Sequence, residues 1–400
     1  MIKKILLSLI PPIFKIIYFR IPFFSFKFYW KNISKTSFPK ELVDITDKFI
    51  KSKSYKEVSN YWHYINISHY KKLSLEANSI KGSFKLPTYH ATSATPLEQN
   101  PVGIDKFAVT LSLGYFTFLY PHDVFIKNTV KKVENNNINY KFTLFKKHEH
   151  FNYETSLNYN CILILLYENL KKLKEFNLLN KLNDKSFLGF SDPFIEIEEI
   201  KLTHDKINSL IDYHSISTIS TFSKKNNIIL EIGAGSGRVC DTILTFNKEF
   251  KYVICDIPPS IYVSYVRLKI AFPNKKISLC LDIKDNIHMM NSLSNNDILF
   301  IFPHQIELFN KKTFDIFIAN NCLHEMDKKT IKKYMSDVDS YSKYLYFKIW
   351  NKYKVPFSII DNELSAHSKK NYSIKSKWQM IHKEKAIFPS NMYDFIYKID

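Results

Sequence analysis

Arginine is nearly absent from this chain of 400 residues, although the chain is strongly basic. Only three of its 57 basic residues are arginine, and proteins that read nucleic-acid sequence depend on arginine forks to bases and phosphates. The lysines are scattered in twos and form no single stripe. An AT-rich genome produces this preference for lysine over arginine. The formal charge of +19 therefore does not by itself predict a nucleic-acid partner.

Cysteine is also scarce, with five residues, an odd number that contains no C-x-x-C pair. This pattern fits neither a disulfide framework nor a zinc site, so we expect no metal centre. Unpaired thiols are typical of a reducing compartment. The cytoplasm is therefore the expected location.

The first thirty residues have a basic start and an apolar run, as a signal peptide has. However, Pro11 and Pro12 break the run, Lys15 and Arg20 interrupt it, and no small-residue cleavage site follows. Basic residues between apolar ones suit a segment in the headgroup region of an anionic membrane. Two interpretations remain open: an anchor that contacts the cytoplasmic membrane peripherally, or a buried packing segment.

The length of the chain exceeds what one hydrophobic core usually organises, so two domains are expected. Residues 31–210 show mixed short patterns without a catalytic signature, and we assign them to a mixed, mainly helical accessory domain for the substrate. In residues 211–400 short apolar strands alternate with amphipathic helices, which predicts a doubly wound α/β sheet. Strands are expected at 228–232, 252–255, 298–302, 314–319 and 344–349, before an antiparallel hairpin of 378–387 and 392–399.

The strongest local signal is the run LEIGAGSGR at 230–238, which holds three of the seven glycines directly after an apolar strand. Glycine is needed where the backbone turns sharply out of a strand and a ligand approaches without room for a Cβ atom. A dinucleotide fingerprint G-x-G-x-x-G would require glycine at Arg238 or Cys240, and neither is glycine. An NAD-dependent oxidoreductase is therefore disfavoured.

The strand after the glycine turn ends in Asp256, where a carboxylate can accept hydrogen bonds from both hydroxyls of a ribose. Ile257, the next residue, is assigned to the same site. Capping of the helix that follows Pro258 and Pro259 is an alternative role for Asp256, and the two roles are compatible.

Arg238 and Arg267 flank these two motifs in a chain where almost every other basic residue is lysine. The guanidinium group is a rigid planar fork that matches a carboxylate better than an ammonium group does. We expect this fork geometry to matter at both positions, with a carboxylate as the partner.

The strand at 314–319 runs into Asn320, His324 and Glu325. In the expected sheet order the carboxyl end of that strand lies beside the reacting group. An aliphatic hydroxyl is a poor nucleophile at neutral pH, so His324 is a candidate general base, with Glu325 as its orienter or substitute. The alternative is that both residues only begin and cap a helix.

The pattern E-x-G-x-G-x-G from Glu231 to Gly237 resembles motif I of class I S-adenosylmethionine-dependent methyltransferases. Together with LGFSDPF at 188–194, DIPPSIY at 256–262 and NNCLHEM at 320–326, it makes the chain resemble the sugar O-methyltransferases found with bacterial surface-polysaccharide genes. The resemblance spans about residues 185–350, and the N-terminal half matches no family that we can name.

The resemblance implies a Rossmann-like class I methyltransferase fold with S-adenosylmethionine as cofactor. It implies that the glycine turn packs against the cofactor and that Glu231 supports the amino-acid end of the cofactor. The strand end at His304 corresponds to a frequent adenine contact, although a surface loop histidine is the alternative. The implied cofactor residues are Glu231, Gly233, Gly235, Gly237, Asp256, Ile257, His304 and Asn320.

The resemblance also implies a cytoplasmic enzyme that transfers a methyl group to a hydroxyl of a sugar, a nucleotide sugar or a lipid-linked glycan. Because a fold does not fix a function, two other readings remain open. One is a methyltransferase for a protein, lipid or small-molecule acceptor. The other is a non-catalytic cofactor-binding partner in a membrane-bound assembly.

Overall fold

The structure is a computed structural model, and it describes residues 22–36, 38–59, 62–63, 66–67, 69–70, 140–141, 166–182, 194–197, 199–323, 326–350, 352–353, 367–368, 372–386 and 392–399. Within these ranges, no helix combines the length and the apolar character that crossing a membrane requires.

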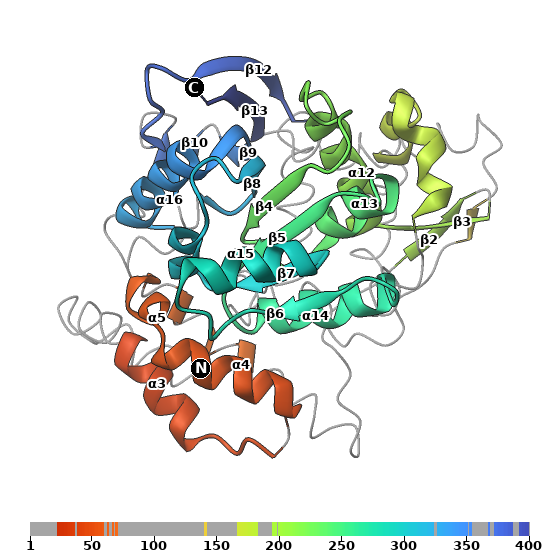
Figure 1. Ribbon diagram of the computed structural model, residues 1–400. Helices are drawn as coiled ribbons and strands as arrows, with labels where there is room; N and C mark the ends of the chain where they lie inside the picture. Colours follow the sequence, from red (N-terminus) through yellow and green to blue (C-terminus); the bar gives the residue numbers. More distant parts are fainter. Residues whose placement is uncertain are drawn as a thin grey trace, which may run out of the picture.

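A sheet of eight strands forms the centre of residues 228–398, in the order β12-β13-β9-β8-β4-β5-β7-β6 (Figure 1). Neighbouring strands from β6 to β9 are parallel, and β13 is antiparallel to both of its neighbours. The strands are β4 (Ile228–Ile232), β5 (Lys251–Cys255), β6 (Ile277–Leu279), β7 (Ile298–Ile301), β8 (Phe314–Asn320), β9 (Ser342–Trp350), β12 (Gln379–Lys385) and β13 (Met392–Lys398).

Successive residues of a strand point to opposite faces of a sheet, and here each face is covered by its own apolar core. Ile229 shares a core with Ile243 of α13, whereas the next residue, Leu230, shares the other core with Val338 of α16. The first core also receives α12 and α14, and the second receives α15. The helices are α12 (His204–Ser217), α13 (Arg238–Phe246), α14 (Ser260–Ala271), α15 (Asn286–Asn295) and α16 (Lys328–Tyr341).

The strand order confirms the predicted doubly wound α/β fold of the Rossmann-like, class I methyltransferase type. From β4 the sheet grows to one side through β5 and β7 and to the other through β8 and β9, so the winding direction switches at β4. In such sheets ligands bind at the switch point, outside the carboxyl ends of the strands. The predicted terminal hairpin is present as β12 and β13, whereas β6 was not predicted.

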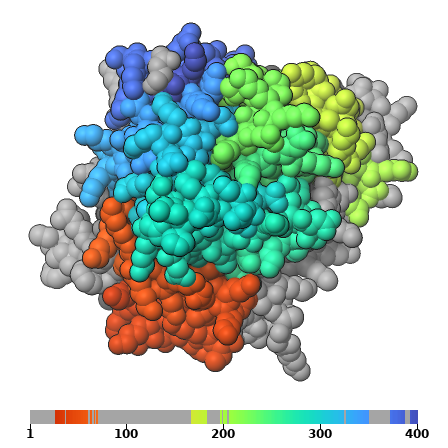
Figure 2. Space-filling view, in the orientation of Figure 1, coloured from red at the N-terminus to blue at the C-terminus, as the bar shows by residue number. Residues whose placement is uncertain are grey.

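The N-terminal helices α3 (Pro22–Asn32), α4 (Lys40–Lys51) and α5 (Lys53–Glu57) pack beside the end of β7 and the short 3-10 helix η3 (Pro303–Leu308). The ring of Phe49 lies 5.6 Å from that of Phe302, and α3 buries Phe26 and Trp30 in the same core. Figure 2 shows the surface of these N-terminal helices adjoining the surface of the residues that form the eight-stranded sheet and its helices. Phe28 of the same helix is 71% exposed, and residues 1–21 lie outside the described part, so the interpretation of the first thirty residues stays a prediction.

The remaining elements are short. They are the three-stranded sheet β1 (Tyr140–Lys141), β2 (Phe194–Ile197) and β3 (Ile200–Thr203), the 3-10 helix η2 (Lys174–Lys181), and the pair β10 (Lys352–Tyr353) and β11 (His367–Ser368). Helix α12 crosses the predicted boundary at 210/211 and packs on α13, so the exact division into domains stays a prediction.

Candidate functional site

The glycine turn leaves β4 at the switch point and ends where α13 begins. Gly233, Gly235 and Gly237 all have positive φ, at 62°, 58° and 75°, a conformation that residues with a Cβ atom rarely adopt. A Cβ atom on Gly233 would lie 2.7 Å from the Cβ atom of Cys322, which is closer than two carbon atoms can approach. Backbone conformation and space therefore both require glycine at position 233.

Asp256 lies at the end of β5 and faces this turn. One carboxylate oxygen, Oδ2, accepts a hydrogen bond from the Gly235 amide at 2.9 Å, and Oδ1 accepts one from Ile257 at 2.7 Å. Burial raises the pKa of Asp256 to about 7, although both hydrogen bonds favour the charged form. The structure thus brings Asp256, Ile257 and the glycine turn together, as the sequence predicts.

Glu231 lies on β4, the strand next to the one that Asp256 follows. It is buried, with 2% of its surface exposed, and its Oε2 accepts a hydrogen bond from the Tyr252 hydroxyl at 2.7 Å. Burial raises the pKa of Glu231 to about 7 as well. Its predicted support of the cofactor's amino-acid end stays a prediction.

Asn320 ends β8, the strand on the other side of β4, and is 8% exposed. Its Nδ2 donates a hydrogen bond of 2.7 Å to Asp212 of α12. Its Oδ1 is buried, and none of the residues that the structure describes donates a hydrogen bond to it. A buried acceptor in a native protein is normally paired, so this atom calls for a donor from a ligand or solvent.

Both arginines that flank the motifs lie against buried carboxylates, whereas the importance of the planar fork stays a prediction. Arg238 donates to Asp212 at 2.6 Å, and Arg267 lies 3.5 Å from Asp241. Arg267, itself 2% exposed, also donates to the Ser236 hydroxyl at 2.9 Å, so it connects α14 to the glycine turn. The carboxylates of Asp212 and Asp241 were not identified from the sequence.

His304 lies at the beginning of η3, against the N-terminal helices. Its Nδ1 is 2.8 Å from the Ser54 hydroxyl, which also accepts a hydrogen bond from the His304 amide at 2.9 Å. Burial lowers the pKa of His304, which favours the neutral ring. The contacts shown by the structure join η3 to α5, and the predicted role as an adenine contact stays a prediction.

His324 and Glu325 lie outside the described residues. The Cys322 thiol is 3.3 Å from the Ile232 carbonyl oxygen, so the chain that follows β8 passes directly beside the glycine turn. The helix that comes next, α16, is capped by Asp327, whose carboxylate accepts from the Thr330 amide at 2.7 Å. Neither His324 nor Glu325 is therefore needed as its N-cap.

Metal-ligand clusters of three or more His, Cys, Asp or Glu side chains are not found among the described residues. The four cysteines in the described ranges are buried. Burial raises the pKa of the Cys255 and Cys280 thiols, so both are weak nucleophiles and weak ligands.

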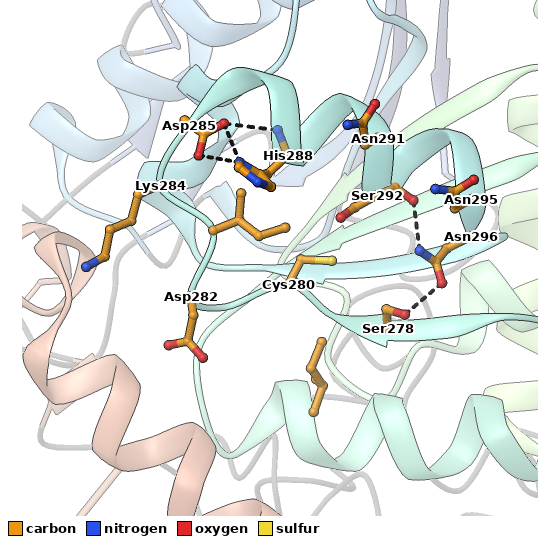
Figure 3. Close-up of a pocket in the computed structure, with 12 residues that line it drawn as sticks. Ser278, Cys280, Asp282, Lys284, Asp285, His288, Asn291, Ser292, Asn295 and Asn296 are labelled. Atoms are coloured by element: carbon orange, nitrogen blue, oxygen red, sulfur yellow. Dashed lines mark hydrogen bonds and ion pairs between the residues drawn. The ribbon is translucent and has the colours of Figure 1, made fainter.

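An open hollow of about 730 Å³ lies away from the glycine turn, between the edge strand β6 and helix α15 (Figure 3). Its polar side chains pair with one another: Asp285 lies 2.7 Å from His288, and Ser278 donates to Asn296 at 2.7 Å. None of the residues predicted to bind cofactor or to act in catalysis lines this hollow.

No protein-family model and no curated protein matches the chain. Solved structures that match it include the pyocyanin biosynthetic protein PhzM, with 11% identity and a TM-score of 0.33 over 59% of this chain and 62% of that chain. An O-methyltransferase family protein from Burkholderia thailandensis matches with 10% identity and a TM-score of 0.32, over 48% and 56% of the two chains. Magnesium protoporphyrin IX methyltransferase from Synechocystis with bound SAM matches with 7% identity and a TM-score of 0.32, over 50% and 85%.

The chain spans less than two thirds of the length of the first and second of these proteins. The fold class, a Rossmann-like α/β fold of the class I methyltransferase type, rests on the strand order.

Proposed function

We propose that this chain is an S-adenosylmethionine-dependent O-methyltransferase that acts on a sugar hydroxyl in bacterial surface-glycan biosynthesis. The observation that carries the proposal is the arrangement at the switch point, where the glycine turn, Asp256 and the unpaired Oδ1 of Asn320 occupy the carboxyl ends of three adjacent strands. These groups suit an adenosine joined to an amino acid.

The residues present fit this cofactor. Asp256 has the geometry to accept hydrogen bonds from ribose hydroxyls at the end of β5, and Asn320 offers an acceptor at the end of β8. The glycines leave no side chain between the turn and a ligand, and the α13 N-terminus faces the same edge. S-adenosylmethionine supplies a methyl group attached to a sulfonium, which is the reacting centre when the cofactor is bound.

For the acceptor, the chain's own contribution is to hold a hydroxyl oxygen in line with the methyl carbon and to take its proton. With the cofactor bound, His324 would take the proton of the acceptor hydroxyl as that oxygen receives the methyl group. Alignment alone contributes on the order of 7 kcal/mol or more. The resemblance carried by the motifs at 188–194, 256–262 and 320–326 supports the sugar acceptor. We propose the cytoplasm, at the inner surface of the membrane, as the place where the enzyme acts.

Calorimetric titration with S-adenosylhomocysteine and, separately, with NADH tests the cofactor without knowledge of the acceptor. Saturable binding of S-adenosylhomocysteine alone supports the proposal, whereas binding of NADH or of neither ligand would refute it. Radiolabelled methyl transfer to nucleotide sugars, glycolipids, proteins and small molecules then distinguishes the acceptor classes. A non-catalytic partner would bind the cofactor and transfer no label.

Replacing Asp256 with alanine is expected to weaken S-adenosylhomocysteine binding by about 1.5 to 3 kcal/mol, the scale of hydrogen bonds to a charged group. Calorimetry measures the change, and thermal unfolding verifies that the variant is folded. Asp285→Ala is a matched control, because Asp285 also accepts a backbone hydrogen bond at 3.0 Å but lies at α15. Unchanged affinity in folded Asp256→Ala would contradict the assignment.

The affinity for S-adenosylhomocysteine is expected to rise with pH between about 6 and 8. Burial raises the pKa of Asp256 to about 7, and hydroxyl donors bind the ionised carboxylate better than the neutral acid. The ionised fraction falls roughly tenfold for each pH unit below that pKa, so binding weakens on the acid side and levels off on the basic side. Calorimetry across this pH range measures the affinity. In Asp256→Asn, the change in affinity that comes from ionisation of Asp256 should disappear.

A further inference from the structure

Four charged side chains lie buried together where α12 crosses the strands β9 and β13. Asp212, Lys348 and Asp394 have 1%, 3% and 4% of their side-chain surface exposed, and Arg238 has 14%. Two carboxylates and two cations make the cluster neutral. Because burying ions is costly even when they are paired, such a cluster is retained more for the geometry that it fixes than for stability.

Asp212 is the centre of this cluster. Its two oxygens accept hydrogen bonds from Arg238, Lys348 and Asn320, which come from α13, β9 and β8. Burial opposes the charged form of Asp212, but Lys348 and Arg238 outweigh it and hold its pKa below the usual value. Asp212 is therefore an ionised carboxylate that can only accept hydrogen bonds.

This charge state determines which way the Asn320 amide points. An ionised carboxylate requires the donor end of the amide, so Nδ2 faces Asp212 at 2.7 Å and Oδ1 faces away from it. Oδ1 is left buried, and the described residues provide no donor to it. By orienting the Asn320 amide, the Asp212 carboxylate thus fixes the direction of one acceptor, Asn320 Oδ1, at the end of β8.

The position of this acceptor relative to Asp256 limits the ligand group that can reach it. Asp256 ends the strand on one side of β4, and Asn320 ends the strand on the other side. A cofactor whose ribose lies at Asp256 must extend across the glycine turn to reach Asn320. Its adenine is predicted to lie at the end of β7, on the far side of β5, so the amino-acid end is the part directed toward Asn320. The ammonium group there is a strong donor without acceptor capacity, which an amide oxygen suits.

We propose that Asp212 is a positioning residue that orients Asn320 so that Asn320 Oδ1 accepts a hydrogen bond from the ammonium group of S-adenosylmethionine. This inference rests on the proposed function.

The test compares the affinities for S-adenosylhomocysteine and for its analogue in which hydrogen replaces the α-amino group, both measured by calorimetry. The parent protein is expected to prefer the amino-bearing ligand by about tenfold or more, the scale of a hydrogen bond to a charged donor. Asn320→Ala removes the acceptor and should reduce this preference to within about twofold. Asp212→Asn supplies an amide donor that pairs with Asn320 Oδ1 and turns it away, so it should have the same effect.

Asp394→Asn is the matched control. Asp394 is the other buried carboxylate of the cluster, and its oxygens accept from Ser215 at 3.0 Å and from Tyr346 at 2.9 Å. It should lose stability as Asp212→Asn does, yet retain the full preference for the amino-bearing ligand. Thermal unfolding monitors all three variants, and Asn320→Ala carries the test where Asp212→Asn does not fold.

An unchanged preference in folded Asn320→Ala would overturn the proposal. Equal affinity of the parent protein for the two ligands would overturn it as well and leave the proposed function in place. Binding of neither ligand by the parent protein would refute the proposed function together with this inference. Loss of preference in Asn320→Ala with retention in Asp394→Asn supports it.

Discussion

Gly233→Ala is expected to destabilise the protein by about 2 to 4 kcal/mol and to abolish S-adenosylhomocysteine binding. Alanine at a φ of 62° costs about 1 kcal/mol, and its Cβ atom would meet the Cβ atom of Cys322 at 2.7 Å, an overpacking worth about 1 to 3 kcal/mol. The turn must then shift at the point where the ligand approaches. Urea denaturation measures the stability, and calorimetry measures the binding.

The contact with Cys322 can be separated from the backbone strain by a double-mutant cycle. Cys322→Gly removes the Cβ atom that an alanine at position 233 would meet, so the double variant should be at least about 1 kcal/mol more stable than the sum of the single effects predicts. Additive effects would show that the strain at positive φ, and not the contact, makes glycine necessary.

The central strands could be predicted because parallel strands buried on both faces read as continuous apolar runs. All four residues of β7 and the last four of β4 are buried, and both segments were identified within one residue. Strand β6 could not be predicted, because it has three residues and lies at the sheet edge. Ser278 stands between Ile277 and Leu279, and all three residues are only partly buried.

The approach of Asp256 to the glycine turn was predictable from sheet geometry, since adjacent parallel strands end at the same edge. Asp212 gave no local signal, because it is separated from Asn320 by 108 positions and from Lys348 by 136. Neighbours so distant in the chain meet only through the packing of α12 on the sheet. The one available signal was indirect: Arg238 is an arginine in a lysine-rich chain, and it donates to Asp212.

His304, predicted at a strand end that often contacts cofactor, shows contacts that pack two helices together. The strand end at Phe302 was predicted, but the contact with Ser54 spans 250 positions and depends on how α5 docks on η3. Gln305, the third residue of η3, is fully buried, and its side-chain amide donates to the Cys280 and Ile283 carbonyl oxygens at 2.8 Å. This side chain fixes the loop after β6 against η3, a role that no sequence pattern announced.

His324→Ala is expected to lower kcat by about 10² to 10⁴, the range for loss of a general base, while the affinity for S-adenosylhomocysteine stays unchanged. In the proposed mechanism His324 takes the proton of the acceptor. It follows β8 in the chain, two residues after Cys322, whose thiol lies 3.3 Å from the Ile232 carbonyl oxygen. Initial rates of radiolabelled methyl transfer to the best sugar acceptor measure kcat, and calorimetry measures the affinity.

The pH profile distinguishes a base from a residue that only packs. A histidine base works in its neutral form, so kcat should rise with pH as the ring loses its proton and then level off, and His324→Ala should lose that rise. Glu325→Gln is the companion variant: a smaller loss with the rise retained identifies Glu325 as the orienter. Since Asp327 already caps α16, a helix-capping role does not explain a loss of kcat in either variant. Retention of full kcat in His324→Ala would instead assign the rate to alignment of the acceptor alone.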